Sequence, residues 1–200
     1  RKSIVPGISG MECLKTHHSF PVVPAEPAMG WLEGNLFHEQ ALAAARLAGV
    51  DFIVNNIDNA EREMVAAVAG DLNEAHLAGT KICADIWKIS LPTRADVVIA
   101  SPGGFPRDFD LHQAQKASSV AEMACKRGGH IIIVAETPDG SAKFGKHLKT
   151  ANSPEEVVEM FKRIGMTADA TGKAYMWARG LLKHRVSIVG SRIPKEELHE

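Results

Sequence analysis

The chain has 200 residues, 45% hydrophobic and 24% charged, which is ordinary for a globular protein with a packed core. Its net charge is −1, and no apolar run approaches the roughly 20 residues that cross a bilayer, so we predict neither a nucleic-acid partner nor a membrane span. The three cysteines form no CxxC motif and indicate reduced thiols in a cytoplasmic protein. The chain begins Arg1-Lys2 without a methionine and ends just after an apolar run, so we expect a piece of a longer protein.

The first half of the chain predicts short elements around one long loop. The apolar residues 3–5 predict a strand that ends at Pro6-Gly7. Residues 19–35 contain three prolines and predict a loop, which at this length is usually functional or mobile. The remaining patterns predict a helix over 38–47, a strand over 51–55, a short apolar run over 64–69 and a helix over 71–89.

The second half follows a hinge-like segment, Pro92–Asp96, and is more regular. Its patterns predict strands over 97–101, 130–135 and 185–189 and helices over 110–127, 153–164 and 171–184, with Gly128-Gly129 ending the first helix. Ser153-Pro154-Glu155-Glu156 is an N-terminal capping signature. The predicted fold class is therefore α/β, a parallel-sheet αβα lobe over residues 91–200 preceded by part of a second α/β lobe over residues 1–90.

A candidate binding site lies at residues 101–116, between a strand and the helix after it. Ligands of parallel sheets bind at the carboxyl ends of the strands, and a helix N-terminus favours anions. Gln113 and Lys116 are three residues apart and share one helix face, where an amide and an ammonium suit a carboxylate or a hydroxy acid. The alternative is structural: Asp110 and Gln113 form a capping box and Lys116 is simply solvated. Both interpretations stay open from the residues alone.

Two adjacent histidines, His17 and His18, form the second candidate. A single imidazole is a plausible metal ligand but does not hold a metal tightly by itself. The alternative is an ordinary loop histidine with a satisfied hydrogen bond. The three tryptophans, Trp177 among them, are more often packing residues than cofactor platforms.

Several stretches together resemble the nickel-dependent lactate racemase family. They are RKSIVPGISG at residues 1–10, AGDLNEAH at 69–76, SPGGFPRD at 101–108 and QAQK at 113–116. The resemblance implies two lobes, with residues 1–90 completing the cofactor-binding lobe and residues 91–200 forming the substrate-contacting lobe. It also implies a cytoplasmic isomerase, a racemase or epimerase of small 2-hydroxy acids, that depends on cofactor-biosynthesis proteins.

The resemblance also assigns roles to individual residues. Lys2 matches the lysine that carries the nickel pincer nucleotide covalently, His18 the one protein ligand of nickel, and Gln113 and Lys116 the pair that contacts the substrate. Trp177 matches an aromatic residue that lines the cofactor pocket. The implied reaction is reversible hydride transfer from the substrate C2 to the cofactor, and it needs two general bases.

Two departures from the family pattern bear on activity and substrate. The family's two catalytic histidines precede the lysine, and no residue here matches them, so we expect the chain alone to be inactive. His112 stands where lactate racemases tend to have a tyrosine, which leaves open which hydroxy acid or sugar acid is the substrate.

Two competing functions remain. A nicotinamide-dependent dehydrogenase is disfavoured because Ser101-Pro-Gly-Gly104 lacks GxGxxG spacing. A non-catalytic α/β module that binds a small carboxylate at the helix starting near residue 110 is the alternative from a different class.

Overall fold

The protein is represented by a computed structural model that describes residues 2–27 and 29–198. The chain forms two compact units, one of residues up to His17 with Gly30–Leu91, the other of His18–Met29 with Pro92 onward. The sequence analysis divided the lobes near the same place, after residue 90, but expected residues 18–29 in the first lobe. They belong with unit 2 because Val23 is buried in one apolar cluster with Phe161 and Tyr175. Which unit binds cofactor and which binds substrate stays a prediction.

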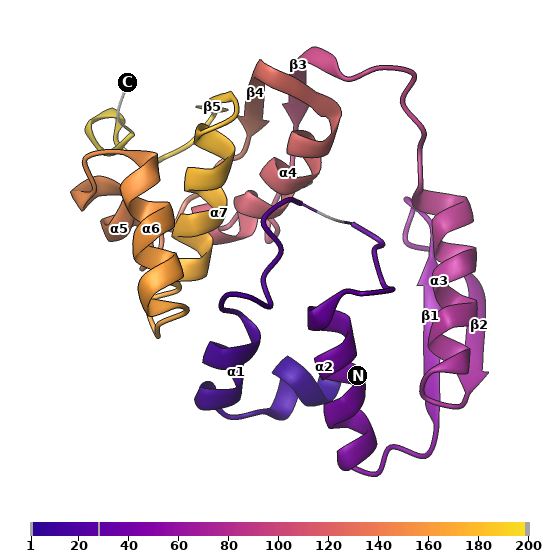
Figure 1. Ribbon diagram of the computed structural model, residues 1–200. Coiled ribbons are helices and arrows are strands. Elements are labelled where there is room, and N and C mark those ends of the chain that lie inside the picture. The colour runs from indigo at the N-terminus through magenta and orange to yellow at the C-terminus, as the bar shows by residue number, and fades with distance from the viewer. Residues whose placement is uncertain (1, 28, 199–200) are drawn as a thin grey trace. The chain divides into compact units, whose positions relative to one another are not determined.

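Unit 1 contains a short antiparallel sheet covered by one helix (Figure 1). Its α3 packs on both strands, and its buried Gly79 allows this close approach, because a Cβ there would lie 3.0 Å from Val68 Cγ2. In chain order the elements are η1 (Ser3–Ile8, a π-helix), α1 (Met11–His17), α2 (Leu36–Leu47), β1 (Ile53–Asp58), β2 (Met64–Gly70) and α3 (Glu74–Trp87).

The predicted strand over residues 3–5 is wrong. The segment is a helical turn in which the Gly7 N–H donates to the Lys2 carbonyl at 2.9 Å. Helix α1 was not predicted either, because its seven residues show too little apolar periodicity. The other elements of unit 1 lie within a few residues of their predicted positions.

Unit 2 contains a three-stranded parallel sheet with the order β3-β4-β5, which confirms the predicted α/β fold. Helices α4 and α7 pack against the sheet and against each other, and α5 and α6 pack on α7 (Figure 1). In chain order the elements are β3 (Ala95–Ala100), α4 (Leu111–Ala124), β4 (Cys125–Val134), α5 (Gly145–Thr150), α6 (Pro154–Ile164), α7 (Thr171–Leu181), β5 (Arg185–Val189) and the 3₁₀ helix η2 (Lys195–Glu197).

The core of unit 2 lies between the sheet and its helices. Ile131 and Ile133 of β4 are fully buried there beside Ala114, Ala174 and Ala178 of the two helices. On the other face of the sheet Val97, Ile99 and Val189 are exposed, as the period of two along a strand requires.

The end of α4 differs from the prediction, whereas the start of α6 matches it. The expected end of a helix at Gly128-Gly129 is wrong: α4 ends at Ala124 and β4 begins at Cys125. Gly129 instead allows two strands to approach, because a Cβ there would lie 2.8 Å from the Asp96 carbonyl. The predicted capping of α6 is confirmed, since Ser153 Oγ accepts from the Glu156 N–H at 3.3 Å and Pro154 is the first helical residue.

Within the described ranges, no helix has the length and apolarity needed to cross a membrane.

Candidate substrate-binding site

The candidate site lies at the carboxyl edge of the parallel sheet, where the segments after β3 and β4 are joined. The Thr137 N–H donates to the Asp108 carbonyl at 3.0 Å, and the Asp139 N–H donates to the Phe109 carbonyl at 3.0 Å. The buried Asp108 carboxylate also accepts from the Glu136 N–H at 3.1 Å. These bonds fix the start of α4 relative to the strand ends, the part of such a sheet where ligands bind.

The first two turns of α4 hold the predicted pair. Asp110 Oδ1 accepts from the Gln113 N–H at 2.8 Å, so the helix has a side-chain cap, as the structural interpretation required. Lys116 Nζ donates to Gln113 Oε1 at 2.6 Å, and the Lys116 side chain is exposed. The structure therefore brings the amide and the ammonium together in a solvent-accessible position, while their contact with a substrate stays a prediction.

A second lysine that the sequence analysis missed approaches the same helix. Lys173 lies in the first turn of α7, and its Nζ donates to Gln115 Oε1 at 2.8 Å. Burial, and then the positive charge of Lys116, lower the pKa of Lys173 to about 8. Burial, and then the charge of Lys173, lower the pKa of His112. No sequence motif marks Lys173, because only the packing of α7 on α4 brings it to this place.

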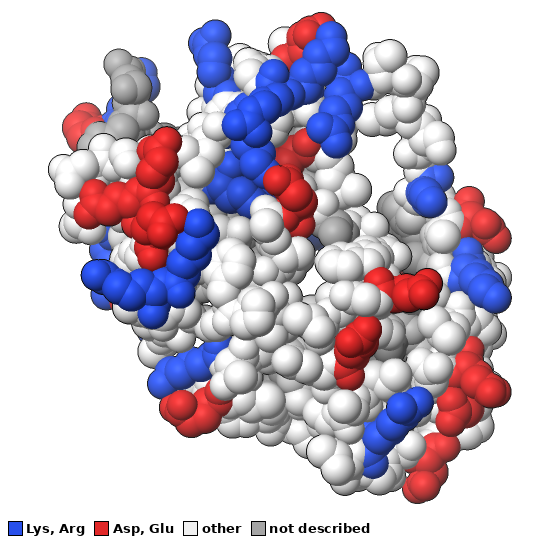
Figure 2. Space-filling view, viewed as in Figure 1, with Lys and Arg blue, Asp and Glu red and all other residues white. Residues whose placement is uncertain are grey.

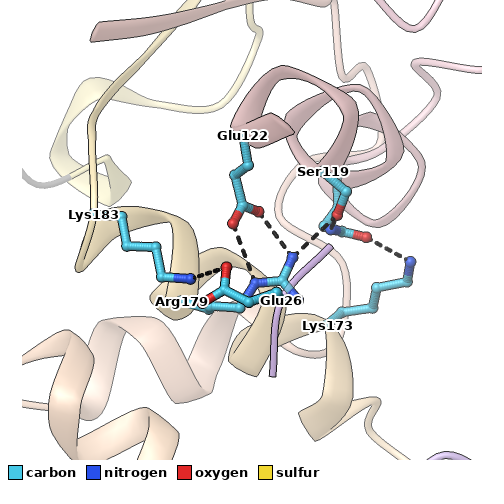
Figure 3. Close-up of polar contacts among 7 residues, drawn as sticks. Glu26, Ser119, Glu122, Lys173, Arg179 and Lys183 are labelled. Atoms are coloured by element: carbon cyan, nitrogen blue, oxygen red, sulfur yellow. Dashed lines mark hydrogen bonds and ion pairs between the residues drawn. The ribbon is translucent and has the colours of Figure 1, made fainter. Parts of the chain in front are cut away.

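A chain of hydrogen bonds continues from Lys173 along the α4–α7 interface (Figure 3). Gln115 Nε2 donates to Ser119 Oγ at 2.6 Å, and farther along Arg179 donates to both oxygens of Glu122, at 2.9 and 3.2 Å. The Arg179 and Glu122 side chains are only 7% and 1% exposed. This bidentate pair neutralises two buried charges, which is the arrangement expected of a structural ion pair.

Beyond that pair lies a pocket lined by charges of both signs. Lys183 donates to Glu26 at 2.5 Å, and this bond lowers the pKa of Glu26. Basic side chains gather beside acidic ones over α4 and α7 in Figure 2. Because carboxylates share this pocket with the cations, it offers an anion a poorer site than the start of α4 does. Its lining residues are Glu26, Pro27, Arg94, Glu122, Arg127, Lys183 and His184.

The two adjacent histidines have different surroundings. His17 ends α1, is 2% exposed, and places its Nε2 3.0 Å from the Phe37 carbonyl, with its ring 3.8 Å from the Phe37 ring. His18 is half-buried and belongs to unit 2. Its neighbour Ser19 accepts from the Met166 N–H at 2.7 Å through Oγ, which anchors this segment. His17 therefore has a packing role, and His18 is the better candidate for a ligand.

The two residues predicted to bind cofactor also differ. The Lys2 side chain is exposed at the start of η1. Trp177 is 5% exposed, lies in the core of unit 2, and donates through Nε1 to the Leu111 carbonyl at 3.3 Å. These contacts give Trp177 a packing role in unit 2, and its place in a cofactor pocket stays a prediction. Across the described ranges, no three His, Cys, Asp or Glu side chains are grouped so as to hold a metal ion.

Comparisons with known proteins agree with this architecture. Residues 91–200 match the lactate racemase C-terminal domain family. The chain is 34% identical to a lactate racemase of Thermoanaerobacterium thermosaccharolyticum, covering 94% of this chain and 45% of the relative. It is 30% identical to a lactate racemase of Lactiplantibacillus plantarum, covering 96% of this chain and 46% of the relative.

A solved structure is also similar. It is the lactate racemase apoprotein from Thermoanaerobacterium thermosaccharolyticum, with a TM-score of 0.89 and 32% identity over 98% of this chain and 48% of that one. The chain therefore spans about half the length of the relatives it matches. With a family match over more than half of its residues and this likeness in fold, the chain belongs to the lactate racemase family.

Proposed function

We propose that the protein containing this chain is a racemase or epimerase of small 2-hydroxy acids. The observation that carries the proposal is the Gln113–Lys116 pair, held by a 2.6 Å hydrogen bond in the first two turns of α4 at the carboxyl edge of the sheet. Relatives named lactate racemase support the reaction type. Because the chain spans less than half of those curated relatives, the activity of the whole protein is a proposal.

In this proposal the two side chains divide the recognition of the substrate. The Lys116 ammonium binds the carboxylate, because a charge-assisted hydrogen bond is the strongest contact this face offers. The Gln113 amide, which already touches Lys116, can donate to the C2 oxygen of the substrate while its own oxygen still accepts from Lys116. Such contacts hold C2 in one place, which a reaction that inverts this carbon needs.

The residues of this chain fit a nickel pincer nucleotide by the chemistry of their donors. A histidine imidazole such as His18 is a suitable nickel ligand, and an exposed primary amine such as Lys2 can carry an acyl-type link. When bound, this group would accept and return the hydride of C2. We propose Lys2 as the attachment point and His18, not His17, as the protein ligand, since the family resemblance places the nickel ligand at residue 18 and His17 is buried against Phe37.

Two consequences follow for the chain as a part of the enzyme. The proton of the C2 hydroxyl needs general bases. The family resemblance leads us to expect these bases outside the 200 residues, so we propose that these residues alone do not racemise substrate. Proteins that make the cofactor are proposed as partners in its loading, and the cytoplasm as the place where this occurs.

The test uses the full-length protein, produced together with its cofactor-making enzymes. We expect a covalent adduct, seen by mass spectrometry, on the peptide that contains Lys2, and its loss in Lys2→Ala. The matched control is Lys15→Ala, which removes another lysine of unit 1, one that pairs with Glu12 at 2.9 Å. An adduct that survives in Lys2→Ala would contradict the attachment point.

The nickel ligand is tested by nickel content in the same preparations. His18→Ala should lose nickel, whereas His17→Gln, which keeps a donor for the Phe37 carbonyl, should retain it. Equal nickel content in the two variants would contradict the assignment. Absence of racemisation of every 2-hydroxy acid by nickel-loaded protein would contradict the proposed function itself.

A further inference from the structure

Two ammonium groups lie at the same edge of unit 2 without a carboxylate partner. Lys116 and Lys173 each donate to a neutral glutamine amide, Gln113 and Gln115, at 2.6 and 2.8 Å. Neither lysine forms an ion pair with any described residue, although other lysines of unit 2, such as Lys126 and Lys183, do. Uncompensated cations near one another are unfavourable unless an anion joins them.

The positions of these groups on the helices explain why they are close. His112, Gln115, Lys116 and Ser119 lie three or four residues apart and therefore form one stripe of α4. Lys173 reaches this stripe from α7 through its bond to Gln115. Helices α4 and α7 pack side by side, and each leads into a parallel strand of the same sheet (Figure 1). Because such a helix runs opposite to the strands, both helices begin at the carboxyl edge of the sheet.

The surroundings of Lys173 do not supply the missing charge. The groups that act on its ammonium are Lys116, whose charge opposes it, and Asp110, whose charge favours it. Asp110 is already engaged as the cap of α4 through the Gln113 N–H. The pKa of His112, the other titratable group beside Lys173, is lowered by burial and then by the charge of Lys173, which favours the neutral imidazole. The site therefore has two cations and one carboxylate that is already bonded as the helix cap, so a net positive charge remains.

We propose that Lys173 is a second substrate-binding cation, which together with Lys116 selects 2-hydroxy acids that carry a second carboxylate. The inference rests on the proposed function and names its substrate class. Lys116 binds the carboxylate beside C2, and Lys173 binds the carboxylate at the other end of a short substrate. His112 lies one turn before Lys116 on α4, where the charges of both lysines act on it, and this is the position where the family resemblance leads us to expect tyrosine.

The first measurement is kcat/KM of the full-length holoenzyme for 2-hydroxysuccinate and for lactate. Wild type should prefer 2-hydroxysuccinate. Lys173→Gln should lose about ten- to hundredfold for 2-hydroxysuccinate, the effect of one charge-assisted contact, and less than about threefold for lactate. Lys173→Arg should retain the preference. The control is Lys162→Gln, an exposed lysine of α6 that pairs with Glu159 and should change neither rate. Equal losses on the two substrates in Lys173→Gln would overturn the proposal.

The second measurement separates this inference from the proposed function. Succinate has two carboxylates but lacks the hydroxyl, so it cannot be racemised. Calorimetry compares its affinity with that of propionate, which has one carboxylate, and the difference reports the two cations alone. Succinate that binds wild type more tightly than Lys173→Gln supports the inference even if no hydroxy acid is racemised. Lactate racemisation with no effect of Lys173→Gln on succinate binding overturns the inference and leaves the proposed function standing.

The third measurement is a pH profile. A lysine with a pKa near 8 loses its charge as the pH rises through 8, so kcat/KM for 2-hydroxysuccinate should fall between about pH 7 and 9. The arginine of Lys173→Arg stays charged throughout this range, so kcat/KM of this variant should not fall between about pH 7 and 9. An identical fall in wild type and Lys173→Arg would contradict a role for the Lys173 charge.

Discussion

Helices α4 and α7 carry charged side chains at two places along their interface, and the two places are built differently. At one, Arg179 and Glu122 are almost fully buried and form a bidentate ion pair. At the other, Lys173 and Lys116 share the edge of the sheet, and each donates to a neutral amide without an ion pair to any residue in the described part of the chain. Burial demands compensation of charge, so the pair can be explained by folding alone. Lys173 is mostly buried beside a neutral amide, and this contrast is the basis of the second carboxylate that we propose for the substrate.

The largest expected effect comes from breaking the compensated end. Glu122→Ala leaves the Arg179 guanidinium buried without its partner, so the free energy of unfolding should fall by roughly 3–5 kcal/mol. Urea-induced unfolding followed by circular dichroism measures this change. The control is the double variant Glu122→Leu/Arg179→Met, which replaces both charges by apolar groups and should recover most of the loss. A double variant as unstable as Glu122→Ala would mean that the pair itself, and not its compensation, stabilises the interface.

The uncompensated end should respond in activity rather than in stability. Lys116→Ala should lower kcat/KM of the full-length enzyme for a 2-hydroxy acid by about ten- to hundredfold, equivalent to roughly 1.5–3 kcal/mol, because a charge-assisted contact to the substrate is lost. Gln113→Ala should cost less, since a neutral hydrogen bond is weaker. The unfolding midpoint in urea should not change, because Lys116 is exposed. Unchanged kinetics in Lys116→Ala would return the pair to a capped and solvated helix start.

The smallest effect is expected at the pocket between these helices and residues 18–29. Lys183→Ala removes an ion pair whose acidic member, Glu26, is 71% exposed, so the free energy of unfolding should fall by no more than about 1 kcal/mol. The effect should shrink further at high salt. A loss as large as that of Glu122→Ala would show that exposure is a poor guide to the strength of pairing in this interface.

The strands of unit 2 and its helices α4, α6 and α7 could be predicted from the sequence in their order, and so could the place of Gln113 and Lys116 on one face of α4, whereas α5 and η2 were not predicted. Continuous apolar runs identify the strands of the parallel sheet, although one face of these strands is exposed. Ser153 and Pro154 identify the start of α6, and the QAQK segment after a glycine turn places Gln113 and Lys116 on one helix. These signals are local, because each depends on residues within a few positions of one another.

Only the tertiary structure decided what depends on segments far apart in the chain. Residues 18–29 belong to unit 2, His17 is buried against Phe37, and Trp177 lies in the core of unit 2. All three facts follow from packing that no local pattern encodes. The same is true of Lys173, which is 57 residues from Lys116 in the sequence and meets its helix through Gln115, 58 residues away. Sequence periodicity tells which face of a helix is apolar, but the partner of that face, and with it the charge left without a partner, is fixed only when the helices pack.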